Sequence, residues 1–329
     1  MLKTFRHLLE LIRFSHTLFA LPFALLAAVM AWTATSHENI ESYDSLRRHY
    51  VTEYVVQMHK SDFRPAFRVQ ELVGLLLCMA SARSFAMSVN RLADRRLDAL
   101  NPRTAGRHLP AGILSVRQVV AFTVACAVVF VVSTLWFLPN RLPIYLSLPV
   151  LAFLAGYSYA KRFTALAHFW LGAALGISPI AVWIAIRGDV VLEHPADLLP
   201  AAVLGGAVLT WVAGFDILYA CQDYDADVKA RLHSVPITLG IPAALPLAAI
   251  CHFATIVLLA YLPWAYPLFG WIYWAGLVPV AVLLVYEHWI VRPNDLSRVN
   301  LAFFQINAVI GVALLAVGTL DLWLGGRGY

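Results

Sequence analysis

Long apolar runs separated by short polar segments dominate the hydropathy pattern of this chain. Several runs reach roughly 20 residues with almost no charge, the length that a helix needs to cross the hydrocarbon core of a bilayer. Because lipid offers the backbone no hydrogen-bond partners, the pattern predicts an all-α bundle of transmembrane helices. Nine spans are expected, at residues 14–34, 69–90, 117–138, 142–160, 164–187, 198–222, 241–263, 266–290 and 301–323.

The start of the first span and the division between the seventh and eighth spans are the least clearly marked boundaries. The apolar run after Arg13 is too long for the core of a signal peptide and lacks a clear small-residue cleavage site, which indicates a retained helix. The seventh and eighth spans are divided only by the Pro-rich stretch 262–267, so a count of eight is the alternative. We expect the whole chain, residues 1–329, to form a single membrane-embedded domain.

One polar segment, at about residues 36–68, interrupts the apolar pattern and is interpreted as an inserted loop. It contains five acidic and five basic residues. Between Leu46 and Met58 its apolar residues recur at helical spacing, which indicates a short amphipathic helix at the membrane interface. A solvated helix without any functional role explains the same spacing equally well.

Composition and charge agree with a membrane protein and give its orientation. The chain is 61% hydrophobic, against about 45–50% for an ordinary soluble domain. With the N-terminus inside, 15 of the 24 Lys and Arg residues fall in inside segments and 8 in outside segments. The positive-inside rule therefore predicts a cytoplasmic N-terminus, and the net charge of +5 reflects topology rather than nucleic-acid binding. The four cysteines lack CxxC spacing and are expected to be packing thiols.

The first of two acidic clusters follows the second apolar run and contains Asn90, Asp94 and Asp98. A helical residue turns by about 100°, so these three side chains should lie within about 80° of one another as one polar ridge. Arg83 falls about 20° from Asn90 on the same face, one to two turns deeper in the span. Carboxylates are unfavourable near lipid, so we expect the protein to use them, and an arginine that deep in an apolar span needs an anionic partner. For one isolated pair of this spacing, interfacial solvation is the commoner explanation.

The second cluster repeats this geometry near residue 220. If one helix continues through it, Asp216, Asp223 and Asp227 lie within about 40° of one another, beside Tyr219 and Gln222. Both clusters fall on the predicted cytoplasmic side, so they can share one site. Carboxylate and amide oxygens are ligands that Mg²⁺ prefers, and nearby Lys and Arg suit a phosphorylated substrate. The two ridges therefore predict a site at which one or two Mg²⁺ ions bind a diphosphate.

Basic residues on the same predicted side supply counter-charge for such a substrate. The segment 101–112 offers Arg103 and Arg107 together with a hydroxyl and two glycines, which suits the binding of phosphate oxygens. Lys161, Arg162 and Lys229 add further cationic donors. A Lys-Arg pair at a span end is as often a topology anchor as a ligand-binding pair.

Three motifs in this chain resemble those of the UbiA superfamily of intramembrane prenyltransferases. They are Asn90-x-x-x-Asp94-x-x-x-Asp98 with the loop Asn101-Pro102-Arg103-Thr104-x-x-Arg107, then Asp216-x-x-Tyr219-x-x-Gln222-Asp223-x-x-x-Asp227-x-Lys229, and Tyr157-x-x-x-Lys161-Arg162-x-Thr164. The similarity covers nearly the whole chain and is closest to the 4-hydroxybenzoate polyprenyltransferase branch, including members associated with menaquinone made by the futalosine route. Arg91, where many relatives carry an acid, and the long 36–68 segment depart from the family pattern.

The resemblance implies an Mg²⁺-dependent transfer of a polyprenyl group from polyprenyl diphosphate to 4-hydroxybenzoate or a dihydroxynaphthoate, in ubiquinone or menaquinone biosynthesis. The implied setting is the cytoplasmic face of a bacterial plasma membrane. The implied metal ligands are Asn90, Asp94, Asp223 and Asp227, with Asp98 in support. The implied catalytic residues are Asp94, Asp223, Asp216 and Arg162, of which Arg162 would bind the carboxylate of the acceptor. The implied substrate-binding residues are Arg83, Arg103, Arg107, Lys161, Tyr219, Gln222 and Lys229.

Other activities stay open as alternatives. Within the superfamily, haem farnesylation and a tocopherol- or chlorophyll-type reaction use related sites. A CDP-alcohol phosphotransferase also uses intramembrane acids and Mg²⁺, but its DGxxAR-type motif is absent from the sequence. A transporter would place ionisable groups near the middle of the membrane and use inverted repeats. Here the acids stand at one end of their spans, which favours an enzyme.

Overall fold

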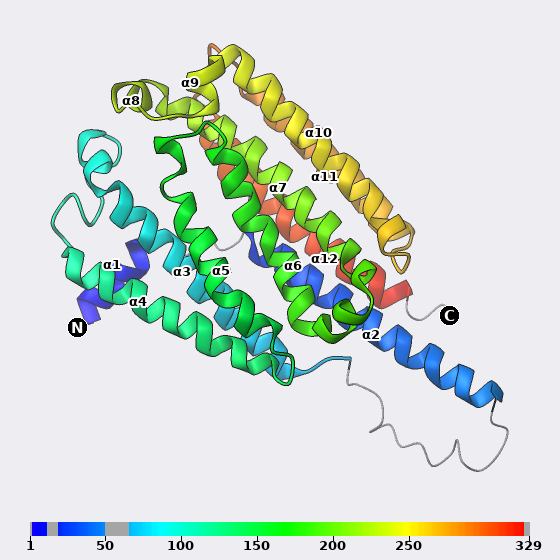
Figure 1. Cartoon of the computed structure of the whole chain (residues 1–329). Helices are drawn as coiled ribbons and strands as arrows, with labels where there is room; N and C mark the ends of the chain where they lie inside the picture. The colour runs from blue at the N-terminus through cyan, green and yellow to red at the C-terminus, as the bar shows by residue number, and fades with distance from the viewer. Residues whose placement is uncertain (1, 12–18, 50–65, 326–329) are drawn as a thin grey trace.

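The computed structural model of the protein describes residues 2–11, 19–49 and 66–325. Every regular element in these ranges is helical (Figure 1). Short turns of 3₁₀-helix join several of the long helices, and one π-helical turn, η7 (Leu301–Ile306), opens the last of them. The α-helices are α1 (Leu2–Leu11), α2 (Leu21–His49), α3 (Val69–Leu100), α4 (Val116–Ser133), α5 (Leu142–Tyr157), α6 (Ala167–Glu193), α7 (Leu199–Ala220), α8 (Tyr224–Lys229), α9 (Val235–Leu239), α10 (Ile241–Ala265), α11 (Trp271–Ile290) and α12 (Asn307–Gly325).

The long helices lie side by side in one bundle, with α7 in its interior (Figure 1). Helix α7 packs against α6 on one side and α10 on the other, while α2 packs against α6 and α12. Helices α3, α4 and α5 form the remaining wall. The short helices α8 and α9 and the loop between α3 and α4 gather at one end of the bundle (Figure 1). This end carries both acidic motifs.

The helices agree with most of the predicted spans, but the count of nine is not confirmed. Seven helices in the described part of the chain are long and apolar enough to cross a membrane, and α5 is a shorter apolar helix. The predicted span 14–34 lies partly on residues 12–18, outside the described ranges, and its remainder belongs to α2. Helices α10 and α11 are separate, so the division expected at 262–267 is present, a few residues further on.

The polar segment at 36–68 is not a loop over its first part. Helix α2 continues without a break to His49, so the prediction of an inserted loop starting at residue 36 is wrong. Residues 36–49 contain no Gly or Pro that would end a helix. The expected amphipathic helix from Leu46 to Met58 lies mostly on residues 50–65, outside the described ranges.

Helices α6 and α7 approach each other closely through glycines. A Cβ atom on Gly172 would lie 2.3 Å from the carbonyl oxygen of Leu209, and one on Gly176 would lie 2.5 Å from that of Gly205. Gly205 meets the carbonyl oxygen of Gly176 in the same way, at 2.6 Å. Small residues four apart allow such backbone contact between membrane helices. This contact fixes α6 beside α7 and therefore fixes the position of residues at both ends of α6.

A buried arginine connects several helices at the end of the bundle away from the acidic motifs. The guanidinium of Arg187 on α6 is 1% exposed and donates to both carboxylate oxygens of Asp197, with Nη2 to Oδ1 at 2.6 Å. It also donates to both carboxylate oxygens of Glu38 and to the hydroxyl of Thr35 on α2. Burial of an arginine requires such pairing. The network joins α2, α6 and the turn η5 (Pro195–Leu198).

Candidate active site

Asn90, Asp94 and Asp98 lie on one unbroken helix, because α3 continues ten residues past the predicted end of its span. The predicted polar ridge is therefore present. The amide nitrogen of Asn90 donates to Asp94 Oδ2 at 3.2 Å, and the amide oxygen accepts from Arg91 Nη1 at 3.3 Å. The same Nη1 of Arg91 lies 4.0 Å from Asp98 Oδ2. Arg91, the departure from the family pattern, is thus part of this ridge and adds positive charge to it.

The loop between α3 and α4 bridges the two acidic motifs. Arg103 donates to both carboxylate oxygens of Asp223, from Nε at 3.0 Å and from Nη2 at 2.7 Å. Its Nη1 donates to the hydroxyl of Tyr219 at 3.1 Å. Arg107 donates to Asp98 Oδ1 at 2.6 Å. Burial is the largest single influence and would lower the pKa of Arg103, but the charges and hydrogen bonds of Asp223 and Tyr219 together outweigh it and the pKa is raised. Each predicted arginine of the loop is paired with a predicted acid.

Short-range contacts give this loop its shape. The backbone N–H of Arg103 donates to Asn101 Oδ1 at 2.9 Å, as in an Asx-turn. The buried hydroxyl of Thr104 donates to the carbonyl oxygen of Asp98 at 2.9 Å. Gly112 has φ +69°, a conformation that favours glycine. The hydroxyl predicted to bind phosphate is therefore used to hold the loop on the end of α3.

The second motif is not a continuous helical ridge, so the predicted 40° alignment is wrong. Helix α7 ends at Ala220, a 3₁₀ turn η6 (Cys221–Asp223) follows, and α8 starts a new helix at Tyr224. The turn changes the helical phase between Asp216 and the later acids. Asp216 faces α6, Asp223 faces the loop, and Asp227 is buried in α8. In the described part of the chain no three acids of the two motifs have oxygens within 4.8 Å of one another.

His168, near the start of α6, is a site residue that sequence reasoning missed. It is 0% exposed, and its Nδ1 lies 2.7 Å from Asp216 Oδ2. Its Nε2 accepts the backbone N–H of Val235 at 3.3 Å. Since Nε2 is an acceptor, the ring proton is on Nδ1 and is donated to Asp216. The sequence signal was a histidine close to the end of an apolar span, on the same side as both acidic motifs.

Lys161 and Arg162 lie in the turn η4 (Ala160–Arg162), between α5 and α6. The Lys161 ammonium interacts electrostatically with Asp216, Asp227 and Asp223 of the second motif and with Asp94 of the first. Burial alone would lower the pKa of Lys161, but these carboxylates raise it above its ordinary value. Arg162 Nη2 donates to Asp94 Oδ1 at 3.1 Å and to the carbonyl oxygen of Ala93 at 2.7 Å. Arg162 is therefore hydrogen-bonded to the first ridge, and Lys161 interacts with it electrostatically.

The remaining predicted residues occupy different environments. Arg83 lines an apolar cavity of about 420 Å³ between α3, α5 and α6, and its Nε has no hydrogen-bond partner in the described residues. Tyr157 lines the same cavity and interacts electrostatically with Asp216 and Asp94, so the cavity reaches the acidic site. Gln222 is half-buried, with its amide nitrogen likewise unpaired. Lys229 ends α8 and is exposed, outside the contacts described above.

The model of the UbiA prenyltransferase family matches residues 62–309, which is most of the chain. The chain belongs to this family. The 4-hydroxybenzoate octaprenyltransferase of Tolumonas auensis is 32% identical over 228 residues, 69% of this chain and 76% of that protein. The enzyme of the same name from Serratia proteamaculans is 31% identical over 256 residues, 77% of this chain and 82% of that protein.

Solved structures of UbiA homologs share the fold. The apo structure of a homolog from Aeropyrum pernix K1 has a TM-score of 0.70 and 25% identity, and covers 94% of this chain and 97% of that one. A homolog from Archaeoglobus fulgidus bound to DMAPP and Mg²⁺ has a TM-score of 0.64 and 18% identity, and covers 96% of this chain and 99% of that one. As a member of the UbiA family with seven long apolar helices, the chain is an integral membrane prenyltransferase rather than a transporter.

The donor atoms present in this UbiA family member fit Mg²⁺. The predicted ligand set contains only carboxylate and amide oxygens, which Mg²⁺ prefers. Oδ2 of Asp227 is buried and has no hydrogen-bond partner in the described residues. Oδ2 of Asp98 is also buried without a hydrogen-bond partner among the described residues, although Arg107 donates to Oδ1 of the same carboxylate and Arg91 lies 4.0 Å from Oδ2. A buried carboxylate oxygen without a partner is unfavourable in the absence of a cation. These two atoms are therefore suited to a metal ion or its bound water.

Proposed function

We propose that the protein transfers a polyprenyl group from polyprenyl diphosphate to an aromatic acid, 4-hydroxybenzoate or a dihydroxynaphthoate, in ubiquinone or menaquinone biosynthesis. One observation carries the proposal: arginine-paired acids from two motifs stand at the end of an apolar cavity. A polar site for a diphosphate thus adjoins an apolar space for its hydrocarbon tail. The relatives named as 4-hydroxybenzoate octaprenyltransferases support the benzoate as the first acceptor to test.

The diphosphate would bind between the two acidic motifs. Mg²⁺ held by Asn90, Asp94, Asp223 and Asp227, with Asp98 in support, would neutralise the diphosphate charge. Arg103 and Arg107 stabilise the negative charge that develops on the diphosphate as the allylic C–O bond breaks. Arg83 is directed into the apolar cavity and is suited to the innermost phosphate oxygens. Lys161, Gln222 and Lys229 remain proposed substrate-binding residues on the same rim.

The aromatic acceptor would bind beside Asp216. The Nδ1–H of His168 orients this carboxylate, so that its other oxygen can accept a hydrogen bond from a phenolic hydroxyl. Tyr219 packs on Phe303 of η7 with ring centroids 4.3 Å apart and shares Arg103 with Asp223. Arg162 is proposed to bind the acceptor carboxylate. The ring carbon ortho to the hydroxyl then forms a bond with the allylic carbon, and loss of the ring proton restores aromaticity.

The prenyl tail would lie in the cavity lined by α3, α5 and α6. Ala174 lines this cavity from α6, so Ala174→Phe should narrow it and shift the accepted diphosphates towards shorter chains. Ala121→Phe, at an exposed position of α4, is the matched control and should leave the chain-length profile unchanged. An unchanged profile in Ala174→Phe would mean that the tail binds elsewhere.

The proposed location is the inner membrane of a bacterium, with the acidic site at the cytoplasmic face. The bacterial relatives support the membrane, and the excess of Lys and Arg on the site's side of the spans supports the orientation. Labelling of single cysteines from either side of sealed vesicles tests it. A cysteine at exposed Arg96 should react only with reagent on the cytoplasmic side.

Two experiments test the reaction itself. Membranes containing the protein receive both aromatic acids and a mixture of prenyl diphosphates, and mass spectrometry identifies the product. A prenylated benzoate or naphthoate supports the proposal, whereas a parallel reaction that forms product only with added haem or a chlorophyll-type acceptor contradicts it. Purified Asp94→Asn and Asp223→Asn variants should lose Mg²⁺-dependent transfer. Full activity in both would exclude the proposed metal ligands while leaving the acceptor assignment intact.

A further inference from the structure

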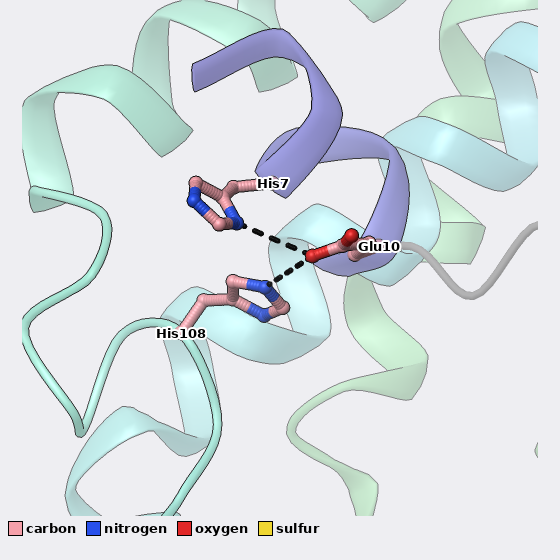
Figure 2. A group of neighbouring side chains, drawn as sticks. All are labelled: His7, Glu10 and His108. Atoms are coloured by element: carbon pink, nitrogen blue, oxygen red, sulfur yellow. Dashed lines mark hydrogen bonds and ion pairs between the residues drawn. The ribbon is translucent and has the colours of Figure 1, made fainter. Parts of the chain in front are cut away.

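A second group of metal-ligating side chains lies where α1 meets the loop between α3 and α4. His7 and Glu10 come from α1 and His108 comes from the loop, and Figure 2 shows both imidazoles directed at one carboxylate. Oε2 of Glu10 lies 3.2 Å from Nδ1 of His7 and 3.4 Å from Nε2 of His108. The three ligand atoms lie within 4.8 Å of one another, the one such group of His, Cys, Asp and Glu in the described residues.

The packing of α1 brings these groups together. His7 and Glu10 are three residues apart and so share one helix face. Leu8 and Leu11, on the adjoining face, pack with Leu114 and Val119 in a small apolar cluster apart from the main core. The apolar contact positions α1 against the start of α4 and the loop before it. His108 of that loop then faces the polar side of α1, with its ring centroid 5.5 Å from that of His7.

We propose that His7, Glu10 and His108 form a binding site for a divalent transition-metal ion, for which Zn²⁺ is the best match. Two imidazole nitrogens and one carboxylate oxygen are a ligand set that binds Zn²⁺ with one position open. Tetrahedral bonds of the usual Zn²⁺ length separate neighbouring ligand atoms by about 3.3 Å, close to the 3.2 and 3.4 Å found here. Mg²⁺ prefers oxygen ligands, so this site is chemically distinct from the one proposed for the reaction.

Neighbouring residues orient the Glu10 carboxylate so that one of its oxygens can bind a metal ion. Arg6 Nε donates to Oε1 at 2.8 Å, which leaves Oε2 facing the two imidazoles. Outer hydrogen bonds of this kind orient metal-binding carboxylates. The Glu10 side chain is 43% exposed, which gives an ion access from water and leaves room for a water ligand.

A bound ion would link α1 to the loop between α3 and α4, two segments that are far apart in the sequence but adjacent in space. His108 follows Arg107, which is bonded to Asp98, and Arg103 lies five residues before it. The ion would therefore restrain the segment that carries both arginines of the reaction site. The proposal does not depend on the identity of the aromatic acceptor or on the Mg²⁺ ligands.

The test is a metal titration of the full-length protein in detergent, with Mg²⁺ in excess throughout. Isothermal titration calorimetry measures Zn²⁺ binding, and Co²⁺ in its place reports tetrahedral nitrogen and oxygen coordination through its visible absorption. We expect His7→Ala, His108→Gln and Glu10→Gln each to lose at least about tenfold in Zn²⁺ affinity, since even outer-shell changes have effects of that size. His194→Ala, at an exposed histidine at the far end of α6, should bind Zn²⁺ like the wild type.

A second readout separates loss of the site from loss of the fold. Zn²⁺ should slow hydrogen–deuterium exchange of the loop residues 103–114 in the wild type and in His194→Ala, but not in His108→Gln. Circular dichroism and gel filtration confirm that the variants are folded. Equal Zn²⁺ affinity in the wild type and His7→Ala would overturn the proposal, as would the absence of saturable binding or an octahedral Co²⁺ spectrum.

Discussion

Arg103 and Asp223, 120 residues apart in the chain, form two parallel hydrogen bonds of 3.0 and 2.7 Å. One residue belongs to the loop after the first motif and the other to the 3₁₀ turn inside the second. The pair therefore connects the two halves of the acidic site. Its planar geometry is one that arginine provides and lysine does not.

The first prediction concerns this pair. Arg103→Ala should reduce kcat/KM for prenyl transfer by about 10²–10³, the range found when one charge-stabilising donor is removed. Arg103→Lys keeps the charge but not the paired hydrogen bonds, so it should recover only part of the activity. Steady-state assays at saturating Mg²⁺ measure both. Arg96→Ala, an exposed arginine on α3, is the control and should be fully active, and a fully active Arg103→Lys would show that charge alone suffices.

The second prediction concerns the hydrogen bond from His168 to Asp216. Removing it in His168→Ala should lower activity by about 10–100-fold, the equivalent of one hydrogen bond to a charged group. His168→Asn keeps a donor near the Nδ1 position and should be the more active of the two. In a double-mutant cycle with Asp216→Asn, the two losses should be clearly non-additive. Additive losses would mean that the two residues act independently and that His168 does not position Asp216.

The third prediction concerns the contact between α6 and α7. Gly176→Ala places a Cβ 2.5 Å from a backbone carbonyl that cannot move freely, so it should lower the free energy of unfolding by about 1–3 kcal/mol. Gly206→Ala meets only Leu258 at 3.5 Å, an ordinary contact, and should be neutral or slightly stabilising. Thermal unfolding in detergent compares the two. Equal melting temperatures for both variants would contradict the close approach of the two backbones.

The fourth prediction concerns the buried Arg187. Arg187→Met leaves the carboxylate of Asp197 without its main partner, which should lower the free energy of unfolding by about 3–5 kcal/mol. Arg141→Met, at an exposed arginine near the same end of the bundle, should change it little. His168 and Arg187 are about 28 Å apart along α6, so the folded fraction of Arg187→Met should keep its acceptor KM. A raised KM in folded protein would link the two ends of the helix.

The first motif could be predicted from the sequence because α3 is one uninterrupted helix. A constant turn of 100° per residue then decides which side chains share a face, and Asn90, Asp94 and Asp98 do. The second motif could not be predicted in this way. The turn η6 breaks the phase after Ala220, and nothing in the hydropathy of the segment marks where an α-helix tightens into 3₁₀ geometry.

Contacts between segments that are distant in the sequence also could not be predicted. The sequence predicts Arg103, Arg107 and Arg162 as cations of the candidate site, but their partners depend on how the loop and η4 pack against α3 and η6. His168 was missed because a single histidine in an apolar span has no periodic signal. The count of nine spans is not confirmed for a related reason: α5 has only 16 residues and α2 carries polar residues to His49, so length and hydropathy alone do not define these two helices as spans.

Helix α6 is held at three points along its length, by His168 at one end, Arg187 at the other and the glycine contact with α7 between them. The opposite face of the same helix lines the apolar cavity. Because three contacts hold α6 in place, we expect it to resist the outward displacement that a bulkier molecule in the cavity would require. The width of the apolar cavity then depends on the size of a few side chains. A single substitution that adds or removes an aromatic ring should therefore change this width while the rest of the bundle stays unchanged.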